Sequence, residues 1–280
     1  MKISFMTHVC AEWPLDRVLD AAARYGYHGV EFRIDAKNLH GVEVTATAAE
    51  RRAIRAQLER TGIEPCCVAT SLYAYQEQIL NDAPARIQLA SDIGCPGIRI
   101  FCGMPLPEGM TTAQAIARCG RHLAQLAPLA EQAGVGLWLE THDTLCKAAD
   151  AMAAIRLAGH PAVALNFDLL HSFRMGEPLE LSLACARGLV RHTHFHDAVT
   201  GPGVLDIVPF GRGNTPLDAM LKGLVTIGYD GYVSGEFFPG NFDPDPERSI
   251  EIFRDDIVGL MARNNVTLAP RRQSAQVETR

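Results

Sequence analysis

Four side chains of types that commonly bind divalent metals each end a short apolar run. They are Glu140 in GVGLWLE, Asp168 in AVALNFD, His194 in RHTHFHD and Glu236 in GYVSGEF, and they are 28, 26 and 42 residues apart. A strand, a helix and the next parallel strand together take roughly 30 residues. Ligands bind at the carboxyl ends of parallel strands, so this spacing predicts a site there. Three carboxylates and one imidazole suit Mn²⁺, Mg²⁺ or Co²⁺, and Zn²⁺ also fits.

Polar side chains recur at every second position in two of these runs. Asn166 and Asp168 share one face of their predicted strand, and His192, His194 and His196 share one face of the next. Imidazole and carboxylate groups are costly to bury without partners. A metal ion or a dense hydrogen-bond network would remove that cost. His192 could instead be a core histidine whose ring bonds only to backbone atoms.

Short apolar segments alternate along the whole chain with amphipathic helical patterns. The predicted strands are 3–7, 29–33, 63–69, 97–101, 134–140, 162–168, 192–197 and 232–238. Several helical patterns end at glycine, and Thr47 with Glu50 forms a capping box at the start of one of them. Eight strand–helix units predict a single-domain (β/α)₈ TIM barrel over residues 1–263. A doubly wound open sheet is the alternative, but ISFMTHVCAEW has no Gly-rich fingerprint.

Composition and charge exclude several classes of protein. The chain has 280 residues, of which 48% are hydrophobic, and a net charge of −6, which disfavours nucleic acids and anionic membranes as partners. No run of about 18 apolar residues predicts a transmembrane helix. The eight cysteines have no framework or CxxC spacing, which favours a reducing cytoplasm. Residues 264–280 lack periodicity, so we expect a flexible tail or one docked on a partner. A homo-oligomer remains open.

A resemblance to a known family rests on six motifs that occur in a fixed order. They are GYHGVEFR, LWLETHD, NFDLLH, HTHFHD, FGRGNTP and GYVSGEFF. Over about residues 1–263 the chain resembles the xylose isomerase-like barrel superfamily, in particular its sugar and sugar phosphate isomerase/epimerase branch. That superfamily also includes inosose dehydratases and apurinic endonucleases. The resemblance implies that Glu140, Asp168, His194 and Glu236 bind one metal ion, and that Glu140 and Glu236 also act as acid and base.

Four residues are candidates for binding the substrate, and the resemblance points to two of them. His171 matches the substrate-binding histidine of the family, and His142 matches a position that is often polar near the site. His196 stands where the dehydratase branch commonly has lysine, and it either contacts the substrate or supports a metal ligand. Arg212 in the FGRGN loop is either a turn residue or a clamp for a substrate oxygen.

Two further features limit the substrate class. FFPGNFDP, at the end of the eighth predicted strand, lacks the Gly-rich backbone nest and the Lys or Arg of a phosphate site, so the FGRGN loop with Arg212 is the only candidate for one. A neutral sugar, a cyclitol or a keto acid is therefore favoured. SLYAY, FCGMP and DIVPF lack the additional ligands of the endonucleases, which excludes a three-metal site. Glu31 and Arg33 are expected to form an ion pair inside the barrel.

We therefore expect a divalent-metal-dependent isomerase or epimerase of a small keto sugar or cyclitol, with Mn²⁺ the favoured ion. Removal of a proton α to a carbonyl would give a metal-bound enediolate, which is reprotonated at the same or the neighbouring carbon. The alternative is a dehydratase or other lyase that expels a β-hydroxyl from the same intermediate, with His142, His171 or His196 as the acid. A non-catalytic binding barrel is a third, less favoured reading.

Overall fold

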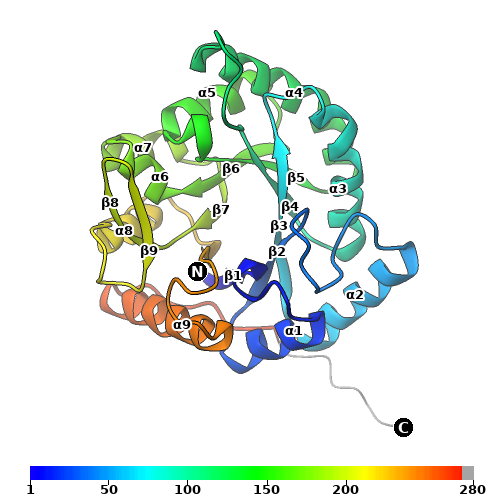
Figure 1. Cartoon of the computed structure of the whole chain (residues 1–280), viewed down its shortest axis with the longest axis vertical. Coiled ribbons are helices and arrows are strands. Elements are labelled where there is room, and N and C mark those ends of the chain that lie inside the picture. The colour runs from blue at the N-terminus through cyan, green and yellow to red at the C-terminus, as the bar shows by residue number, and fades with distance from the viewer. Residues whose placement is uncertain (273–280) are drawn as a thin grey trace.

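Eight parallel strands close into a barrel in the order β1-β10-β7-β6-β5-β4-β3-β2 (Figure 1). This computed structural model describes residues 1–272. The predicted TIM barrel is confirmed. The barrel strands are β1 (Lys2–Met6), β2 (Gly29–Arg33), β3 (Glu64–Tyr73), β4 (Gly97–Phe101), β5 (Gly136–Glu140), β6 (Val163–Asp168), β7 (Val190–His194) and β10 (Tyr232–Gly235).

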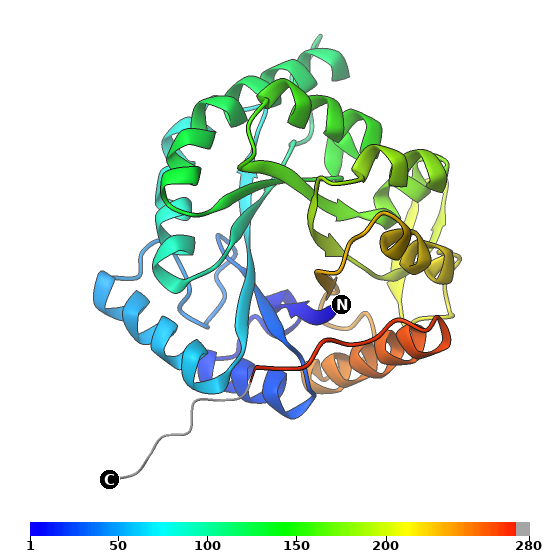
Figure 2. The same cartoon turned by 180° about the vertical axis from the view of Figure 1, so that it is seen from behind.

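Helices surround the barrel on its outside, as the view from behind also shows (Figure 2). The predicted capping box of α2 is present, because the Thr47 hydroxyl accepts from Glu50 N and the Glu50 carboxylate accepts from Thr47 N. Gly62 ends that helix with a φ of 68°. The helices are η1 (Thr7–Cys10), α1 (Leu15–Arg24), α2 (Ala48–Thr61), α3 (Ile79–Ile93), α4 (Thr112–Gln132), η2 (Asp143–Leu145), α5 (Ala148–Ala158), α6 (Leu169–Arg174), α7 (Leu179–Ala186), α8 (Leu217–Thr226) and α9 (Pro246–Arg263).

The chain after β7 differs from the sequence prediction. The predicted strand 192–197 begins at Val190 and ends at His194, and an unpredicted antiparallel hairpin follows, made of β8 (Asp197–Gly201) and β9 (Val204–Val208). The Asp197 carboxylate turns the chain at this point, because it accepts hydrogen bonds from the backbone N–H groups of Gly211, Gly213 and Thr215. The hairpin therefore extends the loop after β7 instead of the barrel.

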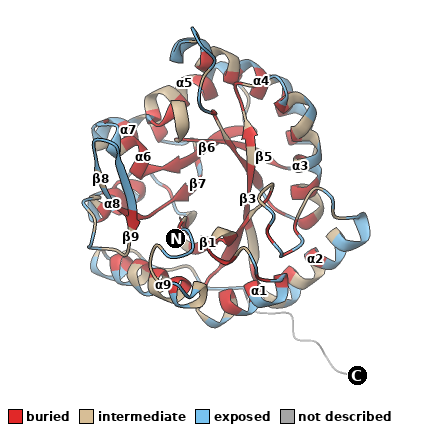
Figure 3. Cartoon of the chain, in the orientation of Figure 1, coloured by how far each residue is buried: buried red, intermediate tan, exposed pale blue. Residues whose placement is uncertain are grey.

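Alternation along the strands separates an apolar exterior from a polar interior. Most of the barrel strands are coloured as buried (Figure 3). Side chains such as Phe32, Ile98 and Leu139 pack beneath the helices and are fully buried. The inward positions between them carry buried polar groups, including Glu31 and Arg99. A β-strand points successive side chains to opposite faces, so these polar groups share the inside of the barrel with a small apolar cluster of Cys67, Trp138 and Ala164.

A tryptophan closes the N-terminal end of the barrel. Trp138 is 5% exposed and clusters with Cys67 and Ala164. Its indole occupies the space that side chains at positions 97 and 136 would need, since a Cβ added to Gly97 or Gly136 would lie 2.2 Å from an indole atom. Glycine is required at both positions because the ring approaches the backbone so closely.

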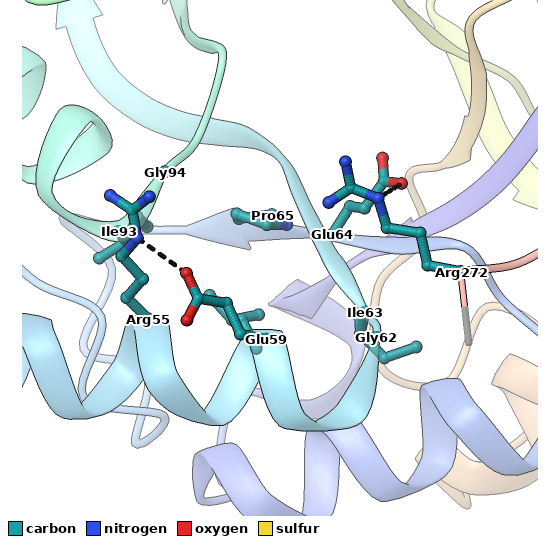
Figure 4. A pocket seen from close by; sticks show the side chains of 10 residues that line it. Arg55, Glu59, Gly62, Ile63, Glu64, Pro65, Ile93, Gly94 and Arg272 are labelled. Atoms are coloured by element: carbon teal, nitrogen blue, oxygen red, sulfur yellow. Dashed lines mark hydrogen bonds and ion pairs between the residues drawn. The ribbon is translucent and has the colours of Figure 1, made fainter. Parts of the chain in front are cut away.

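The N-terminal face also carries the last described residues. Ala269 donates its N–H to Met1 O, and its carbonyl oxygen lies 2.7 Å from His28 Nε2. A pocket beside them is lined by Arg55, Glu64 and Arg272 among others, with Arg272 against Glu64 (Figure 4). This pocket lies at the opposite end of the strands from the predicted metal site. Residues 273–280 of the predicted tail lie outside the described residues, so its flexibility stays a prediction.

The structure also bears on membrane association. Within residues 1–272, no helix is long and apolar enough to cross a membrane.

Candidate metal and catalytic site

The structure brings together the four residues predicted to bind metal. Glu140, Asp168 and His194 are the last residues of β5, β6 and β7, and Glu236 directly follows β10. One potential ligand atom from each lies within 4.8 Å of those from the other three. Glu140, Asp168 and His194 are fully buried, whereas the Glu236 side chain is 12% exposed. Glu236 therefore lies nearest to the solvent at the barrel mouth.

Strand register explains this convergence. Asp168 of β6 pairs with His194 of β7, which in turn pairs with Ser234 of β10, two residues before Glu236. Glu140 of β5 pairs with Asn166, two residues before Asp168. Because side chains two residues apart point to the same face, all four ligand candidates point into the barrel near its C-terminal end.

His194 lies at the centre of the carboxylates. Its Nδ1 is 2.5 Å from Glu140 Oε1 and 3.1 Å from Glu236 Oε2, and its Nε2 is 3.0 Å from Glu31 Oε1. Burial alone would lower the pKa of His194, but Glu236, Glu31 and Glu140 together raise it well above its usual value. Burial would raise the pKa of Glu236, but His194 and Arg99 hold it well below its usual value. Without a metal, a proton on His194 therefore compensates part of the negative charge.

Asp168 has two roles, because it also caps a short helix. Its Oδ1 accepts a hydrogen bond from Leu170 N at 2.9 Å, at the start of α6. Its Oδ2 lies 3.0 Å from His196 Nε2 and 3.5 Å from His171 Nε2. Burial opposes ionisation, but these histidines hold the pKa of Asp168 well below its usual value. The carboxylate is therefore fixed in position and ionised.

His196 lies behind the ligand set. It is 3% exposed, with Nε2 near Asp168 Oδ2 and Nδ1 2.8 Å from the Glu236 carbonyl oxygen. Both partners only accept hydrogen bonds, so the ring satisfies both only when both of its nitrogens carry protons. Burial lowers the pKa of His196, but Asp168 and Glu236 raise it to about 9. The protein uses both ring nitrogens, so substrate contact by His196 stays a prediction.

His171 and His142 lie side by side at the edge of the site, with ring centroids 4.2 Å apart. Arg174 Nε donates to His171 Nδ1 at 2.6 Å, which leaves the proton of the neutral ring on Nε2. Burial lowers the pKa of His171 to about 3. Burial also lowers the pKa of His142, but Asp143 and Glu140 outweigh it and raise that pKa above its usual value. The pair thus combines a neutral N–H donor with a more basic imidazole whose side chain is 29% exposed.

The donor set fits a divalent cation. Glu140 Oε2 is buried and accepts no hydrogen bond from residues 1–272, although Arg99 Nε lies 3.3 Å away. Arg99 is the buried guanidinium beside the site and stacks over the Phe101 ring at 3.8 Å. Glu140, Asp168 and Glu236 place three carboxylates in one buried cluster with a single imidazole, His194. Three carboxylates and one imidazole nitrogen suit a Lewis-acidic divalent ion with oxygen-rich ligation.

Two sequence predictions about the barrel interior are wrong. Glu31 does not pair with Arg33, because Glu31 lies deeper in the barrel and contacts His192 and His194. Arg33 instead donates to the carbonyl oxygen of Ile34 and to other uncharged acceptors. His192 is buried, as expected for a core histidine, but its Nε2 lies 2.9 Å from Glu31 Oε2, and its ring makes no hydrogen bond to the backbone of residues 1–272.

Sequence reasoning also missed Arg99 and His8. Arg99 stands in the middle of the apolar strand GIRIF, and a lone charge in a buried strand is a signal that could have found it. His8 lies in η1 after β1, where its ring meets Phe238 edge-to-face with centroids 4.7 Å apart. His8 directly follows the predicted strand 3–7, so its place at a strand end is a signal that could have found it.

Arg212 lies in the exposed loop that Asp197 organises. Its side chain makes no hydrogen bond or ion pair within the described chain, so a contact with a substrate oxygen stays a prediction.

Comparisons with known proteins found related sequences and barrels of the same fold. Fructoselysine 3-epimerase of Escherichia coli O157:H7 is 23% identical over 252 residues, which cover 84% of this chain and 90% of that protein. The solved structure of IOLI protein with a bound zinc atom matches with a TM-score of 0.83 and 20% identity, over 94% of this chain and 99% of that one. L-ribulose 3-epimerase matches with a TM-score of 0.77 and 19% identity, over 94% and 95%.

The likeness to the two solved structures concerns the fold, since their sequence identity is low. A comparison with protein families gives a match at the level of sequence over most of the chain. Residues 19–255 match the family described as xylose isomerase-like TIM barrel. The chain therefore belongs to the xylose isomerase-like TIM barrel family.

Proposed function

We propose that this protein is a divalent-metal-dependent epimerase or isomerase that acts on a small keto sugar or cyclitol. The observation that carries the proposal is the position of Glu140 and Glu236, which approach one imidazole nitrogen, His194 Nδ1, from different strands of the barrel. Family membership and the relatives named as sugar epimerases support the reaction class.

Four residues would hold the ion: Glu140, Asp168, His194 and Glu236. A bound divalent cation would act as a Lewis acid that polarises a carbonyl oxygen and so acidifies the neighbouring C–H bond. Mn²⁺ remains the favoured ion because the donor set is rich in oxygen, and Mg²⁺, Co²⁺ and Zn²⁺ are the alternatives.

Glu140 and Glu236 would move the protons. The two carboxylates come from β5 and from the end of β10, which are separated in the barrel by β6 and β7. An epimerase needs one group to remove a proton from one face of a carbon and a second group to return it on the other. Two carboxylates on separated strands meet this need, and positioned acid–base groups typically contribute about 10²–10⁴-fold to rate.

His171 would orient the substrate. Its Nδ1 is occupied by Arg174, so the proton of the neutral ring is on Nε2, which lies 3.5 Å from Asp168 Oδ2. This N–H would donate to a substrate hydroxyl or carbonyl oxygen without changing charge. A neutral donor of this kind suits an uncharged sugar oxygen. Burial keeps the ring neutral at physiological pH, since it lowers the pKa to about 3.

His142 supports a second candidate function, that of a dehydratase. Burial would lower the pKa of His142, but Asp143 and Glu140 raise it above its usual value, so the imidazole can carry a proton near neutral pH. A group of this kind could protonate a β-hydroxyl as it leaves. The dehydratase would use the same carboxylates to remove the α-proton and would differ only in the fate of the neighbouring hydroxyl.

Isotope exchange separates the two candidates. We would incubate Mn²⁺-loaded protein in D₂O with a panel of ketoses and inososes and follow substrate mass and stereochemistry. Deuterium uptake without loss of water is expected for an epimerase or isomerase, whereas a product lighter by one molecule of water would support the dehydratase. Absence of exchange across the panel, together with no binding of Mn²⁺ at saturating concentration, would favour a non-catalytic barrel.

Substitution of the acid–base pair tests the assignment of roles. Glu140→Gln should still bind Mn²⁺, with lower affinity, and should lose about 10²–10⁴-fold in turnover. The matched control is Glu64→Gln, which removes a carboxylate at the other end of the barrel, where it contacts Lys2 and Tyr232. Full activity of Glu140→Gln would remove Glu140 from the acid–base role.

A further inference from the structure

A carboxylate lies directly beneath the predicted metal ligands and has no role in the proposed chemistry. Glu31 on β2 is fully buried, and three donors surround it. Its Oε1 lies 3.0 Å from His194 Nε2, and its Oε2 lies 2.9 Å from both His192 Nε2 and Ser234 Oγ. These contacts come from β7 and β10, which are neighbouring strands in the barrel. An ionised carboxylate in this position is fully satisfied by hydrogen bonds.

The contact between Glu31 and His194 decides which nitrogen of His194 is available to a metal. A carboxylate only accepts hydrogen bonds, so the nitrogen that faces Glu31 must carry a proton. That nitrogen is Nε2. In the neutral ring the other nitrogen, Nδ1, then presents its lone pair, and Nδ1 is the atom that faces Glu140 and Glu236.

Glu31 is itself held in place from below. His192 donates to it while its ring stacks on Trp138, with centroids 5.9 Å apart and planes at 17°. Ser234 holds the same oxygen from β10. Because every side chain in this group is buried, Glu31 cannot rotate away from His194 without leaving donors unsatisfied, which is costly in the interior.

We propose that Glu31 is a positioning residue, which fixes the tautomer and ring orientation of His194 so that Nδ1 is directed at the metal. This inference rests on the proposed metal-dependent function. Outer carboxylates that accept the second N–H of a ligating histidine are a known way to orient such ligands, and their loss typically costs about 10–100-fold in metal affinity.

A different use of the same residues is that Glu31, His192 and His194 hold a second metal ion, since their ligand atoms also lie within 4.8 Å of one another. The chemistry of His194 disfavours it. Nε2 would have to give up its proton while Nδ1 binds the first ion, which requires an imidazolate. The hydrogen-bonded arrangement needs no such deprotonation.

The test compares metal binding and the tautomer of His194 in wild type and Glu31→Gln. A glutamine side chain has one acceptor oxygen in place of two, so it cannot satisfy His192, His194 and Ser234 together. We would titrate Zn²⁺ by calorimetry and record long-range ¹H–¹⁵N spectra of the histidine rings in the Zn²⁺-loaded proteins. Glu64→Gln is the matched control, because it also removes a carboxylate with two side-chain donors.

Wild type is expected to bind one equivalent of Zn²⁺ with a single His194 tautomer protonated at Nε2. Glu31→Gln should bind one equivalent about 10–100-fold more weakly and show a mixed or altered tautomer, whereas Glu64→Gln should match wild type. Ser234→Ala removes one donor to Glu31 and should weaken binding by about two- to tenfold, which gives a test even if Glu31→Gln does not fold.

Three other results would overturn the inference. Unchanged affinity and tautomer in both Glu31→Gln and Ser234→Ala would mean that Glu31 does not position His194. Two equivalents of Zn²⁺ in wild type, falling to one in Glu31→Gln, would make Glu31 a ligand. No binding of Zn²⁺ by wild type would refute the proposed metal-dependent function itself, which distinguishes that failure from the failure of Glu31 alone.

Discussion

Replacement of Gly97 by alanine should disturb both the stability of the barrel and the metal site above it. Gly97 begins β4, and a Cβ at this position would lie 2.2 Å from Trp138 Cε2 and 2.3 Å from Cζ2. These distances are far below van der Waals contact, so the backbone or the indole must move. The indole is confined by Cys67 and Ala164 on one side and by the stacked His192 ring on another.

The size of the effect follows from two opposing contributions. An alanine in place of glycine inside a strand would by itself stabilise the fold by about 0.5–1 kcal/mol. Forcing an extra methyl group into a packed core typically costs about 1–3 kcal/mol, and more where the neighbour is rigid. The confined indole puts the packing cost near the top of its range, so subtracting the gain from replacing glycine leaves a net loss of about 2 kcal/mol. Each kcal/mol lowers the Tm of a chain near this size by about 2–4 °C.

Thermal unfolding of the metal-free protein measures the loss, and calorimetric titration with Mn²⁺ measures the effect on the site. The matched control is Gly201→Ala, since no atom lies within 4 Å of a Cβ built there. Adding Trp138→Phe to Gly97→Ala should recover part of the loss, because the smaller ring makes room. A Tm for Gly97→Ala equal to that of wild type would refute the reasoning, since it would mean that the indole does not occupy this space.

Three other perturbations have expected outcomes. Burial lowers the pKa of His40 from 6.5 to about 4, while its Nδ1 accepts from Val42 N. Between these pH values the unfolded chain therefore binds more protons than the folded chain, so acid destabilises the fold. In urea unfolding, the difference in stability between wild type and His40→Gln should be fully present above about pH 6.5 and should decline by up to about 3 kcal/mol towards pH 4. Asp197→Ala should free the loop around Arg212, so trypsin should cleave after Arg212 faster. Mn²⁺ at about 100 times its Kd should raise the free energy of unfolding by about 2.7 kcal/mol, and Asp168→Asn should reduce that gain.

Each of these outcomes has a clear contrary result. A difference between wild type and His40→Gln that does not change with pH would mean that the imidazole is not held neutral by burial. Equal trypsin rates at Arg212 would show that Asp197 does not order the loop. A Tm that Mn²⁺ raises equally in wild type and Asp168→Asn would place the ion elsewhere.

The ends of the strands could be predicted from the sequence because local and global signals agree there. Glu140, Asp168 and His194 each close an apolar run, and their separation matches one strand–helix unit. The capping box of α2 was equally local, since Thr47 and Glu50 are three residues apart and act on each other. In both cases the information lies within one element or in the length of the chain between two elements.

The partners inside the barrel could not be predicted in this way. Glu31 meets His194 across 163 residues of sequence, and this contact depends on strand stagger, which no local pattern records. The expected pair of Glu31 and Arg33 was plausible by spacing alone, but the two side chains lie at different depths. The lone charge of Arg99 in an apolar strand indicates an unusual position, but it does not indicate which carboxylate the guanidinium approaches.

The floor of the barrel, formed by Trp138 and His192 near its N-terminal end, lies directly below the metal ligand candidates on the same strands. Trp138 is two residues before Glu140 on the same face of β5, and His192 is two residues before His194 on β7. The floor side chains stack on each other, and Glu31 joins His192 to His194. A change in the packing of Trp138 or His192 therefore reaches the ligand candidates Glu140 and His194, which lie only two residues further along the same strands. This coupling is why a methyl group at Gly97, remote from the barrel mouth, should change metal affinity as well as stability.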